Sequence, residues 1–413
     1  MISKAATRII GLRTRLMMLS GATYLSWDSS KQQIVKPNRF WVLQAFNAQL
    51  GGLYIGIIFA VDLYHKLVDE DITEEGEYTK NEADLEYFAS IMIEIGELVL
   101  ALCIVFLGFV CILKLDDFIY SFNQILSCSN SFYDMLKEKN LDMNAAHKKS
   151  EKMLEFLLAY LFIVSIVLPF GLAAAVFHPI EATHHILETW FEIKVTFEWE
   201  FLPLFIFSVI VLVACGGTVS ILCSHIACYF MLTTTYLDDL KPVAIFKRTG
   251  ARRSILNTKF FGEMEDVEIL KMYRIQRLLN ILLNDFYKSL LVSYHHVAVL
   301  ATAVVLICFA VKFNDIMLSG GIMAYVVVLG SVMAPFALMY FQSGMCGRLV
   351  KISNEFKRTS NKIGERRLLL AKFARSSDTF YIQVAHPFYT IDNVTFVEFC
   401  DQVVSYVITL LLW

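Results

Sequence analysis

Long, sparsely charged stretches of apolar side chains alternate along this chain with segments that carry most of its charged residues. An α-helix needs roughly 20 mostly apolar residues to cross a lipid bilayer. Seven stretches meet this condition: Phe40–Tyr64, Tyr87–Leu113, Leu154–Phe177, Phe201–Phe230, Leu290–Phe313, Ile322–Met345 and Asn393–Trp413. Because these runs are continuous and do not alternate strictly, they predict transmembrane helices and argue against the strands of a β-barrel.

The composition agrees with this interpretation. The chain has 413 residues, of which 57% are hydrophobic and 18% are charged, whereas a soluble domain has about 25% charged residues. The apolar content excludes an intrinsically disordered protein, and the net charge of −3 excludes a strongly basic nucleic-acid binder. We therefore expect an all-α polytopic membrane protein with seven transmembrane helices, and no nucleic-acid partner.

The basic residues are sorted between alternate segments. Of the 36 Lys and Arg residues, 32 lie in segments on the same predicted side as the N-terminus. Only Lys66, Lys80, Lys194 and Lys312 lie on the other side. Because basic residues near the spans stay in the cytoplasm, the sorting predicts a cytoplasmic N-terminus and an extracellular C-terminus, the reverse of a G-protein-coupled receptor.

Three parts follow along the chain. Residues 1–39 form a cytoplasmic segment without the uninterrupted apolar core of a signal peptide. Residues 40–392 hold the first six spans, and residues 393–413 form the last one. Three cytoplasmic segments show apolar residues at helical spacing: Ser131–Met153, Val267–Lys288 and Glu355–Phe373. These helices either form a cytoplasmic layer that packs subunits together or extend into solvent, and the sequence leaves both alternatives open.

Polar side chains recur on one face of the last predicted helix. Helical steps of three and four residues bring them together: Glu398, Asp401 or Gln402, Ser405, Thr409 and Trp413. Several copies around an axis would form acidic rings of Glu398 and Asp401, which favour cations. Leu412 and Trp413 would form a constriction at the outer end. The alternative is a polar contact within one chain.

The second span contains two carboxylates, Glu94 and Glu97. A charged side chain at membrane depth is costly, so it pairs, stays protonated or contacts a polar ligand. His295, His296 and His225 on later spans are potential partners. For Glu94, ligand contact and structural pairing remain equal alternatives, whereas pairing is favoured for Glu97 and the histidines.

Aromatic side chains gather in the outer halves of several spans. Apolar cavities with a few polar groups suit small organic ligands. The candidate ligand-binding residues are Tyr87, Phe88, Met92, Glu94, Phe170, Phe177, Phe205 and Tyr325.

Catalytic and metal-binding patterns are missing from the sequence. It contains no Walker motif, HExxH pair or nucleophile elbow, so we expect neither an enzyme nor a cofactor. The second outer loop holds Glu181, His184, His185 and Glu188, but one short cluster is weak support for zinc, and we expect no metal site.

Three runs resemble the insect odorant and gustatory receptor superfamily. Gustatory receptors end with Thr-Tyr, five apolar residues and Gln-Phe. The run SYVITLLLW, Ser405–Trp413, follows this frame: Tyr406 is identical and Ser405 is similar, but Leu412 stands in place of the Gln. FYTIDNVTF, Phe388–Phe396, resembles the approach to that helix, and YRIQRLLNILLNDFY, Tyr273–Tyr287, resembles the helix before the fifth span.

The resemblance implies a chemosensory, ligand-gated and non-selective cation channel in the plasma membrane, suspected in sensory-neuron dendrites. It implies a homotetramer, or a heterotetramer with a co-receptor, in contact with membrane lipid and opened by a small organic tastant or odorant. The last helices would line the pore, and each subunit would hold a ligand pocket in its outer half. The alternatives are a metabotropic seven-helix receptor and a proton-coupled transporter that uses Glu94 and Glu97.

Overall fold

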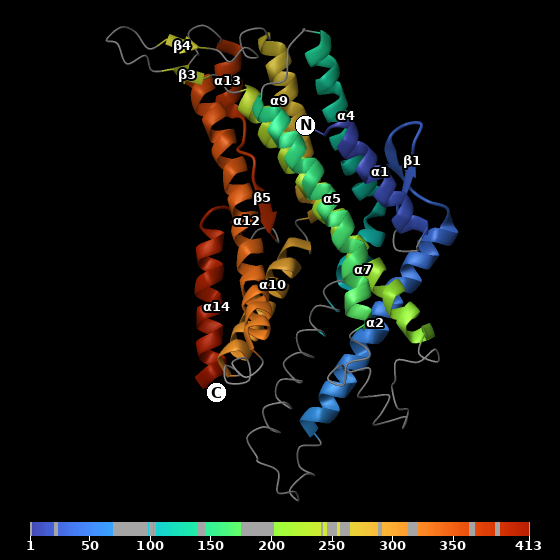
Figure 1. The fold of residues 1–413 in the computed structure, drawn as a ribbon. Helices are drawn as coiled ribbons and strands as arrows, with labels where there is room; N and C mark the ends of the chain where they lie inside the picture. The colour runs from blue at the N-terminus through green and yellow to red at the C-terminus, as the bar shows by residue number, and fades with distance from the viewer. Residues whose placement is uncertain are drawn as a thin grey trace, which may run out of the picture.

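The fold was examined in a computed structural model (Figure 1). It describes a set of segments and the single positions 98 and 102, and every structural statement below concerns these residues. The segments are 2–19, 24–68, 105–138, 145–174, 202–240, 243–245, 254–256, 265–287, 291–312, 321–362, 368–384 and 389–412.

The described chain is almost entirely helical. Its helices are α1 (Lys4–Leu19), α2 (Arg39–Val68), α4 (Leu115–Glu138), α5 (Ala145–Ala174), α7 (Leu202–Leu240), α9 (Asp266–Tyr287), α10 (Leu291–Lys312), α12 (Gly321–Lys362), α13 (Leu368–Ser376) and α14 (Thr395–Leu412). Residues 105–113 are also helical and lead into α4.

Three short antiparallel hairpins accompany these helices. They pair β1 (Ser26–Asp28) with β2 (Gln33–Val35), β3 (Val243–Ile245) with β4 (Ser254–Leu256), and β5 (Ile382–Val384) with β6 (Tyr389–Ile391). Each strand has three residues, so the hairpins shape connections and add no sheet layer to the helical fold.

Three described helices contain segments that are long and apolar enough to cross a bilayer: Val42–Tyr64, Val209–Asp238 and Thr395–Leu412. They coincide with the first, fourth and seventh predicted spans. Most of the second predicted span lies outside the described residues.

The longest helices extend beyond their apolar parts, as the sequence predicts. α12 continues without a break from its uncharged first half into a charged second half that ends at Lys362. α9 covers the helix predicted at Val267–Lys288. In Figure 1, α9, α13 and the second half of α12 lie together at one end, and α14 ends at the other. Within the described residues, these segments therefore pack against one another at one end of the fold.

Beside a small hydrophobic cluster around Met17, two larger clusters hold these helices. The larger one joins α1, α4, α7, α9, α12 and α13, and its fully buried aromatic side chains include Phe118, Tyr229 and Phe356. The smaller one joins α10, α12 and α14 through residues such as Ala303, Met339 and Phe399. Among the described residues, the last helix therefore packs mainly against α10 and α12, apart from the main core.

His225 shows how polar groups are accommodated in the larger cluster. Its Nε2 lies 3.1 Å from Oγ of Ser121, and its Nδ1 lies 2.9 Å from the hydroxyl of Tyr287. The imidazole also stacks on the ring of Phe122. Both ring nitrogens are satisfied, so this histidine connects α4, α7 and α9. Glu94 and Glu97, its predicted partners, lie outside the described residues.

Arg13 ties the N-terminal helix to the bundle. Its guanidinium is buried and donates to the carbonyl oxygen of Ser220, at 3.3 Å, and to Oγ of Ser224. Burial lowers the pKa of Arg13 to about 10, which leaves the group charged at neutral pH. Both serines belong to α7, so residues 4–19 pack against the bundle.

Candidate functional site

Side chains before α14 fix the start of this helix. The backbone N–H of Asp392 donates to Oγ1 of Thr395 (3.0 Å), and that of Val394 donates to Oδ1 of Asp392 (2.8 Å). Glu398 lies in the first turn, where a carboxylate interacts favourably with the positive end of the helix dipole. The chain therefore turns here and places an acidic residue in the first turn of α14.

One face of α14 is buried against α10 and α12. Thr395, Phe399, Val403 and Val407 follow one another at four-residue steps and are all buried. The rings of Phe399 and Phe336 of α12 meet edge to face, with their centroids 5.6 Å apart. This contact surface is apolar, so it holds the helix by packing.

The polar side chains lie on the opposite face. Glu398, Asp401, Gln402, Ser405 and Thr409 are all exposed in the single chain. Leu412, which follows on the same face, is 81% exposed, and Trp413 lies outside the described residues. The structure thus keeps the predicted pore residues out of the packed core.

Two hydroxyl groups of this face bond back to the helix. Oγ of Ser405 donates to the carbonyl oxygen of Asp401 (2.9 Å), and Oγ1 of Thr409 donates to that of Ser405 (2.8 Å). Each hydroxyl therefore uses its proton within α14 and leaves its oxygen lone pairs facing outward. Oxygen acceptors of this kind suit cations and water.

One member of the stripe also has a partner in the chain. The side chain of Gln402 hydrogen-bonds with His296 of α10, and Glu398 interacts electrostatically with the same imidazole. Of the two residues that the helical spacing leaves open, Gln402 therefore leans toward α10. Asp401 is the one without a described side-chain partner.

Exposed apolar side chains flank the polar stripe. Val397, Val404 and Ile408 lie on one side of it, and Tyr406 lies on the other, each more than half exposed. In the single chain, α14 therefore has one buried face, one exposed polar face and exposed apolar flanks.

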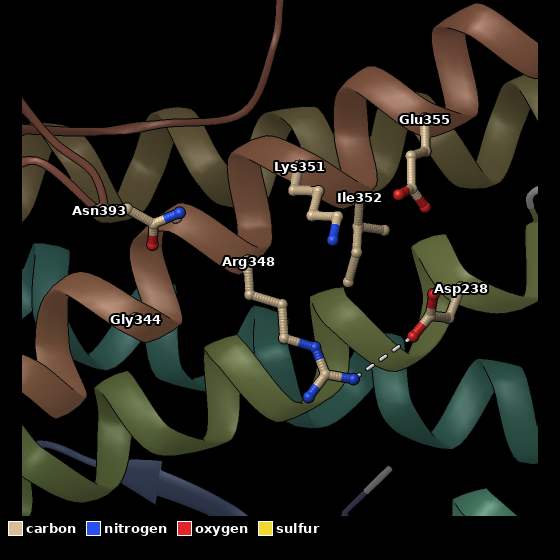
Figure 2. Close-up of a pocket in the computed structure, with 8 residues that line it drawn as sticks. Asp238, Gly344, Arg348, Lys351, Ile352, Glu355 and Asn393 are labelled. Carbon is tan, nitrogen blue, oxygen red and sulfur yellow. Dashed lines mark hydrogen bonds and ion pairs between the residues drawn. The ribbon is translucent and has the colours of Figure 1, made fainter.

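The turn before α14 touches α12 at a glycine. A Cβ added to Gly347 would lie 1.9 Å from Oδ1 of Asn393, whereas one added to Gly344, one turn earlier, would meet nothing within 4 Å. Figure 2 shows Asn393 above this part of α12. Gly347 therefore allows the close approach between α12 and the start of α14.

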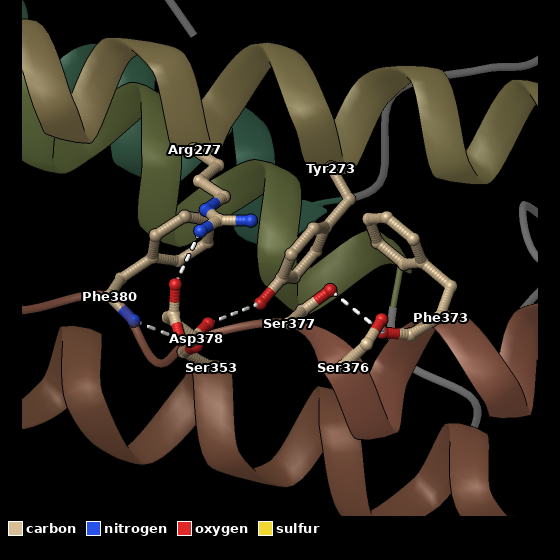
Figure 3. A network of polar contacts seen from close by, with 8 residues as sticks. All are labelled: Tyr273, Arg277, Ser353, Phe373, Ser376, Ser377, Asp378 and Phe380. Carbon is tan, nitrogen blue, oxygen red and sulfur yellow. Dashed lines mark hydrogen bonds and ion pairs between the residues drawn. The ribbon is translucent and has the colours of Figure 1, made fainter.

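A network of polar contacts holds the connection that leads to α14 (Figure 3). The hydroxyl of Tyr273 on α9 donates to the carbonyl oxygen of Asp378 (3.1 Å), and Arg277 pairs with the carboxylate of Asp378. The backbone N–H of Phe380 donates to Oγ of Ser353 on α12 (3.1 Å). The segment is thereby fixed to α9 and α12 together.

Tyr273 is the centre of this network. Its ring stacks on that of Phe356 of α12, with the ring centroids 4.7 Å apart, and also contacts Phe373 and Phe380. Burial raises the pKa of Tyr273 above its usual value, so the hydroxyl keeps the proton that it donates to Asp378.

Amide side chains on α9 form a second set of contacts. Nδ2 of Asn280 donates to the hydroxyl of Tyr229 (2.8 Å) and to the carbonyl oxygen of Tyr381 (3.0 Å). Nδ2 of Asn284 donates to that carbonyl as well (2.9 Å). One helical turn before Asn280, Gln276 accepts from Thr233 of α7 (3.0 Å). A polar ladder therefore joins α7 and α9 to the connection before α14.

Sequence reasoning missed this ladder. It considered only the spacing of the apolar residues in Val267–Lys288, and one of these, Leu278, is 59% exposed. The recurrence of Gln276, Asn280 and Asn284 at four-residue steps was the available signal, because such spacing places three amides on one helical face.

Most of the predicted ligand pocket lies outside the described residues. Tyr87, Phe88, Met92, Glu94 and Phe177 belong to segments that the structure does not describe. Phe170 and Tyr325 lie on α5 and α12, where only their helices are described, and Phe205 is half-buried on α7.

The candidate metal ligands of the second outer loop also lie outside the described residues. Within the segments that the structure describes, no group of three or more His, Cys, Asp or Glu side chains is placed to hold a metal ion.

Comparison with solved structures identifies the fold. The chain superposes on the insect olfactory receptor OR5 from Machilis hrabei in complex with eugenol with a TM-score of 0.55. The match covers 98% of this chain and 97% of the receptor at 11% sequence identity. OR5 without eugenol gives a TM-score of 0.47 at the same identity and coverage. No protein-family model matches the sequence, and no curated protein matches it. The chain therefore has the all-α, polytopic membrane fold of an insect olfactory receptor.

Proposed function

We propose that this chain is a chemosensory receptor of the insect odorant and gustatory receptor superfamily that acts as a ligand-gated cation channel. The observation that carries the proposal is the division of α14 into a buried apolar face and an exposed polar face. The shared fold with OR5, over nearly the full length of both chains, supports the same conclusion. The short motif at Ser405–Trp413 is the sequence feature that favours the gustatory branch.

In this proposal, four copies of α14 surround one axis. The exposed stripe faces the axis, and the flanks with Val404 and Tyr406 contact neighbouring copies. Glu398 and Asp401 then form acidic rings at the cytoplasmic entrance, which attract cations and repel anions. Ser405 and Thr409 line the middle, and Leu412 and Trp413 form the narrow outer end. The assembly contains only this chain, or this chain together with a co-receptor.

Opening requires that ligand binding alters the position of α14. The described contacts provide a mechanical route, because α9 and α12 hold the segment at residues 377–381 that precedes it. Gly347 adds a direct contact between α12 and the turn at Asn393. A ligand that shifts α12 would therefore bias the position of the pore helix.

The ligand class follows from the predicted outer pocket and from the neighbour's ligand. OR5 was solved with eugenol, and the predicted lining of aromatic residues with Glu94 suits a small organic compound with a polar group. We place this pocket in the outer half of each subunit, between the second and sixth spans.

Current in excised outside-out membrane patches tests this function. The protein is expressed alone and with a co-receptor, and a panel of small organic compounds is applied without nucleotides. A channel responds within the patch, whereas a metabotropic receptor falls silent because its soluble partners are lost. A proton-coupled transporter, the other alternative, would give substrate uptake without unitary openings.

A further inference from the structure

A cavity of about 440 Å³ opens between α7, α12 and the turn before α14 (Figure 2). Four charged side chains line it, Asp238, Arg348, Lys351 and Glu355, together with the amide of Asn393. Its volume lies within the range of about 300–1,000 Å³ that is typical of sites for small ligands. None of its lining residues belongs to the polar stripe of α14 or to the residues predicted to line the outer pocket.

The position of the cavity along the helices places it at the membrane boundary. α12 has no acidic or basic residue in Gly321–Gly347, and Arg348 is the first one after this stretch. α7 has no Asp, Glu, Lys or Arg in Leu202–Leu237, and Asp238, the first of these, pairs with Arg348. At 1.5 Å per residue the uncharged stretch of α12 is about 40 Å long, which matches a bilayer with its headgroups, so Arg348 lies at the level of lipid headgroups. The sorted basic residues predict that this level belongs to the cytoplasmic leaflet.

The lining offers both basic and acidic groups. Nη2 of Arg348 lies 3.5 Å from Oδ2 of Asp238, and these side chains are 66% and 36% exposed, so the pair is weak and open to exchange. Lys351 has neither a hydrogen bond nor an ion pair with any described residue, and Figure 2 shows it pointing into the same space as Arg348. Glu355 follows Lys351 by one helical turn and lies farther from the apolar half of α12.

This distribution of charge selects among phospholipid headgroups. Arg348 and Lys351 suit a phosphate, and basic pockets between transmembrane helices bind lipid phosphates. The carboxylates of Asp238 and Glu355 suit a donor next to that phosphate. A primary ammonium supplies three N–H donors, a choline group supplies none, and an inositol headgroup carries no positive charge toward the carboxylates.

We propose that this cavity binds the headgroup of an aminophospholipid of the cytoplasmic leaflet, phosphatidylethanolamine or phosphatidylserine. The assignment rests on the membrane orientation in the proposed function. The phosphate contacts Arg348 and Lys351, and the ammonium contacts Asp238 or Glu355. Asn393 lines the cavity and begins the turn into α14, so an occupied cavity holds that turn and regulates the opening of the pore.

Lipid retention measured by native mass spectrometry of the purified full-length protein in detergent tests this proposal. Phosphatidylethanolamine, phosphatidylcholine and phosphatidylinositol with identical acyl chains are added in turn. We expect phosphatidylethanolamine to bind about tenfold more tightly than phosphatidylcholine, the factor for one charge-assisted hydrogen bond. Phosphatidylinositol should also bind more weakly than phosphatidylethanolamine.

Variants assign each part of the headgroup to its partner. The double variant Arg348→Gln, Lys351→Gln should weaken retention of phosphatidylethanolamine about tenfold or more. Glu355→Gln should reduce the preference for phosphatidylethanolamine over phosphatidylcholine and leave phosphatidylcholine binding unchanged. Lys357→Gln, Arg358→Gln is the matched control, because both residues lie on α12 beyond the cavity.

Equal retention of the three lipids by the unaltered protein would overturn the proposal, even if the variants fail to fold. So would a double variant that retains phosphatidylethanolamine as well as its matched control does. Free phosphoethanolamine that binds as tightly as the lipid would overturn the assignment to a membrane lipid. The experiment needs neither an agonist nor a current, so its outcome is independent of whether the protein conducts ions.

Discussion

Individual residues of this chain gain their importance from how closely two elements approach each other. Gly347 and Gly344 look identical in the sequence, yet only Gly347 faces a neighbour, the side chain of Asn393. Asn280 and Arg277 lie close together on α9, yet the amide is buried and the guanidinium is exposed. Such pairs provide variants whose effects should differ although the sequence changes are similar.

The two glycines of α12 should respond differently to alanine. Gly347→Ala forces the side chain of Asn393 aside, and we expect a loss of about 1 kcal/mol, at the low end of overpacking costs because that side chain can rotate. Gly344→Ala enters open space and should leave stability unchanged or raise it by up to about 1 kcal/mol through helix propensity. Denaturation midpoints of the purified proteins measure this difference, and equal midpoints would contradict the close approach.

The buried amide of α9 should matter more than the exposed ion pair beside it. Asn280→Ala removes the donor to the buried hydroxyl of Tyr229 and one of the two donors to the carbonyl oxygen of Tyr381. It should cost about 1–3 kcal/mol, because two hydrogen bonds between buried groups are lost. Arg277→Gln should cost less than about 1 kcal/mol, since this side chain and Asp378 are 39% and 68% exposed. The same denaturation assay compares them, and a costlier Arg277→Gln would reverse the account of the network.

At the scale of elements, α14 is the helix whose sequence predicts its surroundings best. Its polar stripe and its buried side both follow from helical periodicity, because the polar residues and the buried residues each recur at steps of three or four residues within Thr395–Leu412. α9 was harder to predict, since its buried face combines amides with apolar residues and each amide needs a partner far away in the sequence. No local pattern reveals that Tyr381, about a hundred residues later, supplies the carbonyl group.

Chemical accessibility along α14 tests which face meets water in the open channel. Ser405→Cys and Thr409→Cys place thiols on the exposed stripe, where a charged methanethiosulfonate reagent should reach them and reduce the evoked current. Val403→Cys places a thiol on the buried face, because Val403 is only 1% exposed. The evoked current of this variant should resist the reagent. The unaltered protein, with Cys400 on the same helix, is the reference. Faster modification at position 403 than at 405 would place the stripe elsewhere.

At the scale of the whole molecule, the sequence predicts the fold class better than it predicts individual contacts between residues. Long apolar runs give the all-α, polytopic fold class, which the superposition on OR5 confirms with an identity of only 11%. The predicted orientation and assembly depend on the membrane and on further copies, which one chain does not contain. The ligand pocket was predicted from aromatic residues alone, and most of them lie outside the described segments.

Epitope tags at both ends test the orientation directly. An N-terminal tag should be stained only after the cells are permeabilised, because the segment before the first span is rich in basic residues. A C-terminal tag should be stained on intact cells. Staining of the N-terminal tag on intact cells would invert the membrane orientation and place Glu398 and Asp401 at the outer mouth.

Single-channel recording of the purified protein in a planar bilayer tests the central claim most directly. Unaltered channels are compared with the double variant Glu398→Gln, Asp401→Asn. The control is Asp134→Asn, which neutralises an exposed acidic residue on α4 away from the stripe. We predict openings evoked by a small organic ligand in the unaltered protein. The double variant should conduct at least about twofold less and should prefer cations over anions less strongly, because the acidic rings are lost. Asp134→Asn should behave like the unaltered channel. Unchanged conductance and ion preference in the double variant would contradict the assignment of α14 as the pore helix.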